Sequence, residues 1–228
     1  MNCPSDLPGE AHAATRDRLL DAAEQLFARQ GIAATSLRQV TYEANANLAA
    51  VHYHFGSRAE LVKAVFARRV QPMNAERIRL LDACEAAAPE SGPALEDIFT
   101  ALLSPALRLG ERSEDGGFTF MQLMGRAHME AGEELRPLIA SLFHEVLGRF
   151  SAALSRALPG VPQEVILWRM RFALGAMAFA MIHGSRMGAG HPDDSGSCCD
   201  GPVLDHLIPF VVAGFWSNAV DADAGGAS

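Results

Sequence analysis

Apolar side chains recur every three or four residues along most of this chain, which is the spacing of one face of an α-helix. The first such run begins at Thr15, includes Leu19, Leu26 and Phe27, and ends at Gly31, a residue type that commonly terminates helices. No stretch alternates apolar and polar residues for long enough to indicate a β-strand. The pattern therefore predicts an all-α protein.

Turn-forming residues divide the rest of the chain into further helices. One helix is expected from Ser57 towards Cys84, with Pro72 inside it, where the missing backbone N–H favours a kink. Later helices are expected at residues 94–109, 118–131, 133–158, 162–187 and 203–218. We predict a three-helix domain at residues 15–70 and a larger helical domain at residues 71–220, flanked by disordered segments at residues 1–14 and 221–228.

Residues 35–60 combine short helices with residues that cap helix N-termini. Ser36 and Ser57 each stand three residues before a Gln or a Glu, which is the spacing of a capping box. Asn47 can cap a helix at residues 48–55. Two short helices joined by a tight turn are typical of a helix-turn-helix, whose second helix fits the major groove of DNA.

This segment resembles the N-terminal domain of the TetR family of bacterial repressors. The resemblance extends from about Thr15 to Arg69. It rests on three runs in order, namely Gln30-Gly31-Ile32, Thr35-Ser36-Leu37-Arg38 and Tyr53-His54-Phe55-Gly56-Ser57-Arg58. The family usually has Tyr at the position of His52. The resemblance implies a homodimer that binds a palindromic double-stranded DNA operator.

The predicted recognition helix supplies candidates for DNA contacts. Ala49 and Ala50 are small enough to approach a thymine methyl group, and His52 offers a donor or an acceptor to a base edge. The resemblance implies that Tyr53 and His54 bind phosphates. The full predicted set is Thr35, Ser36, Arg38, Asn47, Leu48, Ala49, Ala50, His52, Tyr53, His54, Arg58 and Lys63. Phe55 is instead expected in the core.

The net charge of −8 argues at first against a polyanionic partner. Its distribution changes that interpretation, because residues 1–70 hold eight basic and seven acidic side chains and the remainder holds eleven basic and twenty acidic. Such an asymmetry is compatible with one nucleic-acid-binding end, although the excess is too small to be evidence alone.

Two parts of the larger domain resemble a narrower branch of the family. They are Phe120-Met121-Gln122-Leu123-Met124-Gly125 and the run at residues 167–176, together with Leu207-Ile208-Pro209-Phe210 and Ala213-Gly214. That branch includes repressors of fatty-acid degradation genes that long-chain fatty acids or their coenzyme A esters release. The resemblance implies an apolar small-molecule effector.

Methionine and phenylalanine side chains on the predicted helices of this domain can form an adaptable apolar pocket or simply pack as core, and both interpretations stay open. Arginine and histidine side chains, Arg169 among them, can meet a charged head group. The predicted ligand-binding residues are Phe120, Met121, Met124, Arg126, His128, Arg171, Phe172, Met177, Phe179 and His183.

The last two predicted helices carry small residues at helical spacing, such as Gly175, Gly184 and Ala213, which permit close contact between helices. The resemblance implies that these two helices form the homodimer interface. Trp168 and Trp216 either anchor that interface or are buried within one subunit.

Other classes of function have less support. A nucleophile elbow, a P-loop and a dinucleotide fingerprint are all absent, so we expect no enzyme activity and no cofactor. A lipid carrier leaves residues 1–70 unexplained. A repressor of an efflux or stress gene that responds to a drug-like compound stays open, as does a metal or redox sensor using Cys198 and Cys199, with His191 and His206 nearby.

The chain contains no apolar run long enough to span a bilayer and no N-terminal secretion signal. We therefore expect a cytoplasmic protein without a membrane partner.

Overall fold

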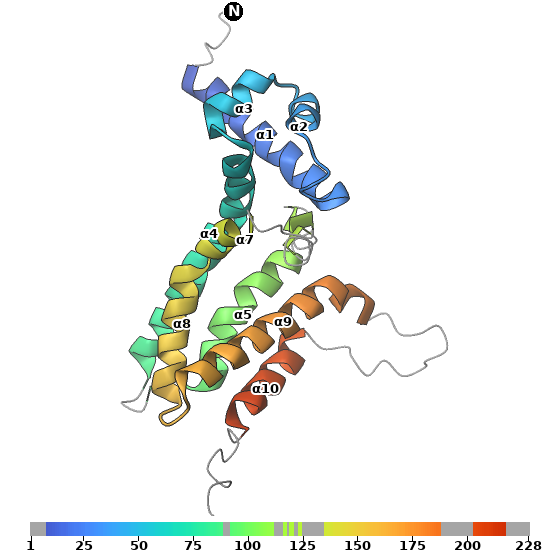
Figure 1. Ribbon diagram of the computed structural model, residues 1–228. Coiled ribbons are helices and arrows are strands. Elements are labelled where there is room, and N and C mark those ends of the chain that lie inside the picture. The colour runs from blue at the N-terminus through green and yellow to red at the C-terminus, as the bar shows by residue number, and fades with distance from the viewer. Residues whose placement is uncertain are drawn as a thin grey trace, which may run out of the picture. The chain divides into compact units, whose positions relative to one another are not determined.

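The computed structural model describes residues 8–88, 92–111, 116–117, 119–120, 123–124, 135–187 and 203–217. All regular elements within these ranges are α-helices, which confirms the predicted all-α fold (Figure 1). In chain order they are α1 (Pro8–Gln30), α2 (Leu37–Glu43), α3 (Leu48–Phe55), α4 (Arg58–Ala87), α5 (Leu95–Glu111), α7 (Leu135–Ser141), α8 (His144–Ala157), α9 (Gln163–Met187) and α10 (Val203–Trp216).

The chain divides into two compact units. The first consists of residues 1–72 and 113–142, and the second of residues 73–112 and 143–228. The long helix α4 contributes to both, and the division falls directly after its internal Pro72.

The first unit is built on α1, which contacts both α2 and α3 (Figure 1). Leu20 and Phe27 of α1 are buried with Val40 of α2 and Val51 of α3. The beginning of α4 adds further buried apolar residues, among them Phe66. Because each short helix buries only one face, its opposite face is left to solvent.

The second unit has α5 at its centre. Residues 101–107 of α5 are all buried, and α5 contacts α8, α9 and α10. The ring of Phe99 lies 4.7 Å from the ring of Phe215 on α10. Arg169 of α9 donates hydrogen bonds of 2.7 Å to the carbonyls of Phe215 and Ser217, which lack donors at the end of α10.

Two helix boundaries differ from the predictions. Helix α1 begins at Pro8 rather than Thr15, so the expected disorder at residues 1–14 is wrong for residues 8–14. Proline suits a first helical turn, because its fixed φ matches the helix and its missing N–H needs no partner there. The single helix predicted at residues 133–158 is two helices, since α7 ends at Ser141 and α8 begins at His144.

The break between α7 and α8 has no glycine or proline to mark it in the sequence. The Leu142 N–H donates to the Ile139 carbonyl at 3.1 Å, which is a turn rather than a helical bond, and no side chain caps α8. Most of the helix predicted at residues 118–131, and the tail at residues 221–228, lie outside the described residues. Among the described helices, none is long and apolar enough to cross a membrane.

Candidate nucleic-acid interface

Side-chain caps fix the starts of the short helices, as the sequence predicts. At α2 the Gln39 N–H donates to Ser36 Oγ at 3.3 Å, and the Ser36 N–H donates to Gln39 Oε1 at 2.8 Å. At α3 the Ala50 N–H donates to Asn47 Oδ1 at 2.9 Å. Ser57 Oγ accepts from the Glu60 N–H at 3.2 Å near the start of α4. These bonds satisfy N–H groups that the first helical turn leaves free.

The turn between α2 and α3 depends on Asn45. This residue has φ 46°, in the left-handed region that side chains other than asparagine and glycine rarely adopt. The turn is closed by a hydrogen bond of 2.8 Å from the Ala46 N–H to the Thr41 carbonyl. It therefore sets the direction in which α3 leaves α2.

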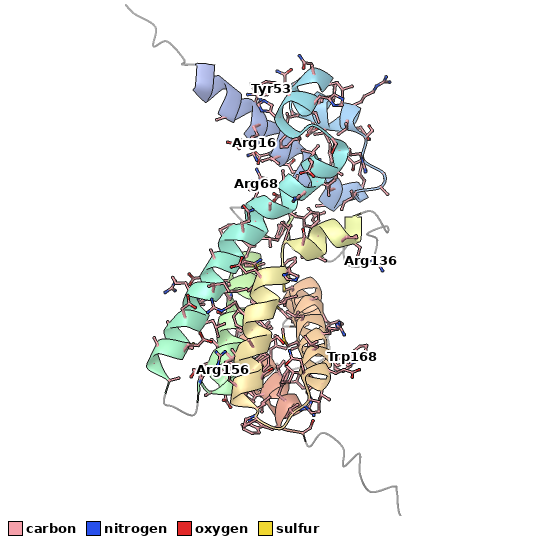
Figure 2. All side chains as sticks on the ribbon, turned by 60° about the vertical axis from the view of Figure 1, so that its left-hand side comes forward. Arg16, Tyr53, Arg68, Arg136, Arg156 and Trp168 are labelled. Atoms are coloured by element: carbon pink, nitrogen blue, oxygen red, sulfur yellow. The ribbon has the colours of Figure 1, made fainter. Side chains whose placement is uncertain are left out.

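Helix α3 has one buried and one exposed face. Val51 and Phe55 are buried, which confirms the core role predicted for Phe55. Leu48, at the first turn of the helix, is 42% exposed, and Tyr53, on the opposite face, is 74% exposed. Tyr53 lies on the outer side of this group of helices (Figure 2). Asn47, Ala49 and His52 are also exposed, and Ala50 and His54 are partly exposed.

His52 has a defined ring orientation. Its Nδ1 lies 3.1 Å from the Gly56 carbonyl oxygen, at the C-terminus of α3. A carbonyl only accepts hydrogen bonds, so Nδ1 must carry the proton. In neutral His52, Nε2 is then a hydrogen-bond acceptor on the exposed side of the helix.

The structure corrects the prediction for Thr35 and qualifies the one for Arg58. Thr35 is only 2% exposed, and its hydroxyl donates to the Gly31 carbonyl at 2.8 Å while accepting from Gln30 Nε2. Thr35 therefore stabilises the end of α1 and has no free donor for DNA. Arg58 is half-buried, and its Nη2 donates to the Ile32 and Thr35 carbonyls, so this nitrogen holds the loop between α1 and α2.

The remaining predicted residues of this set lie at the surface. Ser36 and Arg38 are exposed, and Lys63 is partly exposed on α4. The sequence interpretation missed Tyr42, which is 87% exposed on α2. Tyr42 could have been found from the sequence, because it is a large aromatic side chain at a polar position of a short helix.

The described members of the predicted ligand-binding set come from both units. Phe120 is buried, with its ring 6.1 Å from that of Phe66, and Met124 is half-buried, both in the first unit. Met177 is buried in the second unit. Met121, Arg126 and His128, and the side chain of His183, lie outside the described residues.

Three of the predicted ligand-binding residues, Arg171, Phe172 and Phe179, are exposed on α9. The Arg171 guanidinium lies 5.0 Å from the Trp168 ring, and Trp168 stacks on Phe172. Trp168 lies on the outer side of α9 (Figure 2). The exposed large apolar residues of the last two helices are Leu167, Trp168, Phe172, Phe179, Phe210 and Trp216.

Helix α4 contains a buried arginine that the sequence interpretation also missed. Arg77 is 2% exposed and lies on the same stripe of α4 as the buried Val70, Met73 and Leu81. Burial lowers the pKa of Arg77 to about 10, so the side chain is still charged at neutral pH. An arginine in the apolar stripe of a predicted helix is a signal that sequence alone provides.

The metal-sensing alternative is not tested. No cluster of three or more His, Cys, Asp or Glu side chains suited to a metal ion occurs within the described residues. Cys198, Cys199 and His191 lie outside them, and His206 is exposed on α10.

Two family models match the chain. The one described as "Bacterial regulatory proteins, tetR family" matches residues 19–65, which include the capped helices α2 and α3. The one described as "Tetracyclin repressor-like, C-terminal domain" matches residues 100–214, more than half of the chain. The chain belongs to the TetR family. The resemblance to this family stated for about residues 15–69 is thereby confirmed.

Curated relatives match mainly the N-terminal part of this TetR-family chain. The transcriptional regulator SrpR of Pseudomonas putida is 37% identical over 59 residues, which cover 26% of this chain and 28% of SrpR. The nicotine-responsive repressor HdnoR of Paenarthrobacter nicotinovorans is 31% identical over 101 residues, covering 44% of this chain and 52% of HdnoR. The chain thus spans about half or less of these relatives' length.

Solved structures share the fold over nearly the whole chain. The fatty acid degradation regulator FadR of Bacillus halodurans has a TM-score of 0.62 at 11% identity, covering 95% of this chain and 99% of FadR. SmeT, the repressor of the SmeDEF multidrug efflux pump of Stenotrophomonas maltophilia, has a TM-score of 0.60 at 22% identity, covering 90% and 89%. At these identities the likeness concerns the fold alone.

Proposed function

We propose that this chain is a DNA-binding transcriptional regulator that represses its target genes as a homodimer on a palindromic operator and acts in the cytoplasm. Residues 15–70 read the DNA, and residues 71–220 bind the effector and form the dimer. The observation that carries the proposal is the exposed face of α3, held on a buried apolar face by caps and a defined turn, in a chain of the TetR family. Such a helix has the geometry needed for the major groove.

The base contacts are assigned to the exposed face of α3. Leu48 and Ala49 offer apolar contacts to a thymine methyl group, and neutral His52 offers the acceptor Nε2 to an exocyclic amino group of adenine or cytosine. Tyr53 and His54, with Ser36, Arg38 and Lys63, contact phosphates. Thr35 is left out of this interface, and Arg58 contributes only the donors not engaged with the loop carbonyls.

A site-selection experiment on random duplex DNA tests these roles. We expect the wild-type protein to enrich a palindrome, and His52→Ala to relax the preference at one position of each half-site. Tyr53→Phe, which removes only a hydroxyl, should weaken binding to all sequences alike. Enrichment of no motif by the wild type would contradict specific DNA reading.

The homodimer is assigned to α9 and α10. Their exposed apolar side chains, such as Trp168, Phe172 and Phe210, form the kind of surface that monomers rarely leave in water. Phe172 is 67% exposed, so Phe172→Glu should leave the subunit folded and shift the chain to monomers in sedimentation. Glu145→Ala, on α8, is the matched control and should remain dimeric. A dimeric Phe172→Glu variant would contradict this interface.

The effector is a hydrophobic small molecule that releases the protein from DNA. A long-chain fatty acid or its coenzyme A ester is one candidate, supported by the sequence resemblance and by the fold shared with FadR. A drug-like compound is the second candidate, since the fold is shared with a SmeT–triclosan complex. Anisotropy of labelled operator DNA separates them. Release by a long-chain fatty acid or its acyl-CoA, but not by coenzyme A alone, supports the first candidate, and release by triclosan alone supports the second.

Effector binding is proposed to bend α4 at Pro72, where the two compact units divide. Proline removes one backbone hydrogen bond from the helix and so weakens it locally. A hundredfold loss of operator affinity corresponds to about 2.7 kcal/mol of coupling. Pro72→Ala should reduce the effector response while leaving operator binding intact, and an unchanged response would contradict the bending point.

A further inference from the structure

Arg77 is a buried cation that lacks an anionic partner in the part of the chain that the structure describes. Its Nε donates to the Leu102 carbonyl at 2.7 Å, and its Nη1 donates to Asn74 Oδ1 at 3.1 Å. These two bonds satisfy fewer than half of the N–H groups of a guanidinium. Neither N–H of Nη2 has an acceptor among the described residues.

Three other arginines of α4 have carboxylate partners, whereas Arg58 donates to loop carbonyls. Arg68 and Arg69 share Glu24, and Arg79 pairs with Glu76. All three are more exposed than Arg77, which is the buried arginine among the described residues. Burial lowers the pKa of Arg77, and no described carboxylate lies close enough to oppose that effect. Arg77 is therefore the least solvated cation of the helix, and it has no counter-charge among the described residues.

A purely structural role accounts for only part of this arrangement. The Leu102 carbonyl lies inside α5, where the missing Pro105 N–H leaves the Ala101 carbonyl, not that of Leu102, without its helical donor. Arg77 adds a hydrogen bond to the Leu102 carbonyl, but a neutral donor would do the same without the cost of burying a charge. Buried arginines are almost always paired, because an isolated charge loses its hydration on burial.

The surroundings of Arg77 are apolar. Met73 and Leu81 flank it on α4, and Leu102 and Leu103 of α5 are fully buried. A buried polar group of α5 is also unsatisfied, since the hydroxyl of Ser104 has no hydrogen-bond partner among the described residues. A cation within an apolar interior matches a ligand with one negative charge on an apolar body.

We propose that Arg77 binds the carboxylate of the effector, whose remaining surface is apolar. The inference rests on the proposed function and narrows it, because a carboxylate supplies the missing charge and the acceptors for Nη2. A free acid satisfies this requirement at its head group. A thioester carbonyl is neutral and does not, so Arg77 favours the acid over its coenzyme A ester.

Titration calorimetry on the full-length protein tests the charge preference directly. Two acids, octanoate and naphthoate, are each compared with the corresponding neutral amide of the same shape. For the wild type we expect at least one acid to bind about 10- to 100-fold more tightly than its amide, the usual effect of a charge-assisted hydrogen bond. Arg77→Met should abolish this preference, and Arg77→Lys should retain part of it.

Arg79→Met is the matched control, because Arg79 lies on the same helix but is exposed and paired with Glu76. It should keep the preference for the acid. A wild type that binds neither acid in preference to its amide overturns the inference, as does an Arg77→Met variant that keeps the preference. Operator binding without effector is measured on the same proteins. A wild type that fails to bind the operator contradicts the proposed function, whereas a lost acid preference with intact operator binding contradicts only this inference.

A spectroscopic measurement on the wild type does not depend on the folding of any variant. The carboxyl carbon of ¹³C-labelled octanoate reports its own ionisation when bound. Beside a guanidinium the pKa of the bound acid should fall by about one unit or more below that of the free acid. A bound acid whose pKa is unchanged or raised overturns the assignment of Arg77 as its partner.

Discussion

Glu24→Gln should destabilise the first unit, because Glu24 joins α1 to α4 through a buried carboxylate. The side chain is 4% exposed and accepts hydrogen bonds from Arg68 Nη2 at 2.6 Å and from Arg69 Nη2 at 3.2 Å. Glutamine keeps the shape but removes the charge, and its NH₂ group cannot accept from an arginine. Burial alone would lower the pKa of Arg68, but the hydrogen bonds to Glu24 and Asp21 raise it.

The magnitude follows from the exposure of the partners. Removing one member of a buried ion pair typically costs about 3–5 kcal/mol. The arginine side chains are 25% and 23% exposed, so water compensates part of the loss and we expect about 2–3 kcal/mol. Arg68 Nε already has no hydrogen-bond partner among the described residues, which leaves little scope for rearrangement. Asp21→Asn is the control, since Asp21 is 62% exposed and should cost less than about 1 kcal/mol.

Hydrogen exchange followed by mass spectrometry measures this effect locally, which matters because a chain with two units need not unfold in one step. The slowest amides of α1 should exchange roughly 30- to 150-fold faster in Glu24→Gln, the factor equivalent to the expected free energy. Exchange of α9 amides should hardly change. Equal effects of Glu24→Gln and Asp21→Asn, or no effect of Glu24→Gln, would refute the reasoning.

Three further predictions concern single side chains. Asn47→Ala removes the cap of α3 and should lower stability by about 1 kcal/mol and weaken operator binding, measured by denaturation and anisotropy; unchanged values would contradict the cap's role. Asn45→Ala should cost about 1 kcal/mol in denaturation because φ is 46°, whereas Asn45→Gly should cost nothing. Burial and Asp97 raise the pKa of the Cys84 thiol, so at pH 8 iodoacetamide should alkylate it more slowly than free cysteine, and faster alkylation would contradict this.

The helix starts and the buried face within residues 15–70 could be predicted in detail, because the sequence signals for them lie within a few residues of each feature. Ser36 and Asn47 indicate helix starts, because each side chain accepts a hydrogen bond from the backbone N–H three residues later. The spacing of Val51 and Phe55 identifies the buried face of α3. Thr35 was misplaced because a hydroxyl beside a capping residue is equally able to bond the preceding turn. Whether the Thr35 hydroxyl faces DNA or bonds the end of α1 depends on the packing of α1 against that turn.

The second unit was harder to interpret because aromatic residues at helical spacing do not reveal what covers them. Phe172 and Phe215 both suit an apolar core, yet Phe172 is exposed on α9 while Phe215 packs against Phe99. The partner helices, which are distant in sequence, determine the difference. The break after Ser141 was missed for a related reason, since neither glycine nor proline accompanies it. Arg77 was overlooked although its position in an apolar stripe is visible in the sequence.

The most direct test of DNA reading through α3 is a fluorescence anisotropy titration with duplex DNA from upstream of the protein's own gene. A duplex of the same composition in scrambled order serves as the reference, at one stated salt concentration. We expect the upstream duplex to bind at least about a thousandfold more tightly, the lower end of specific recognition. Equal affinities for the two duplexes would contradict sequence-specific reading and leave only the fold.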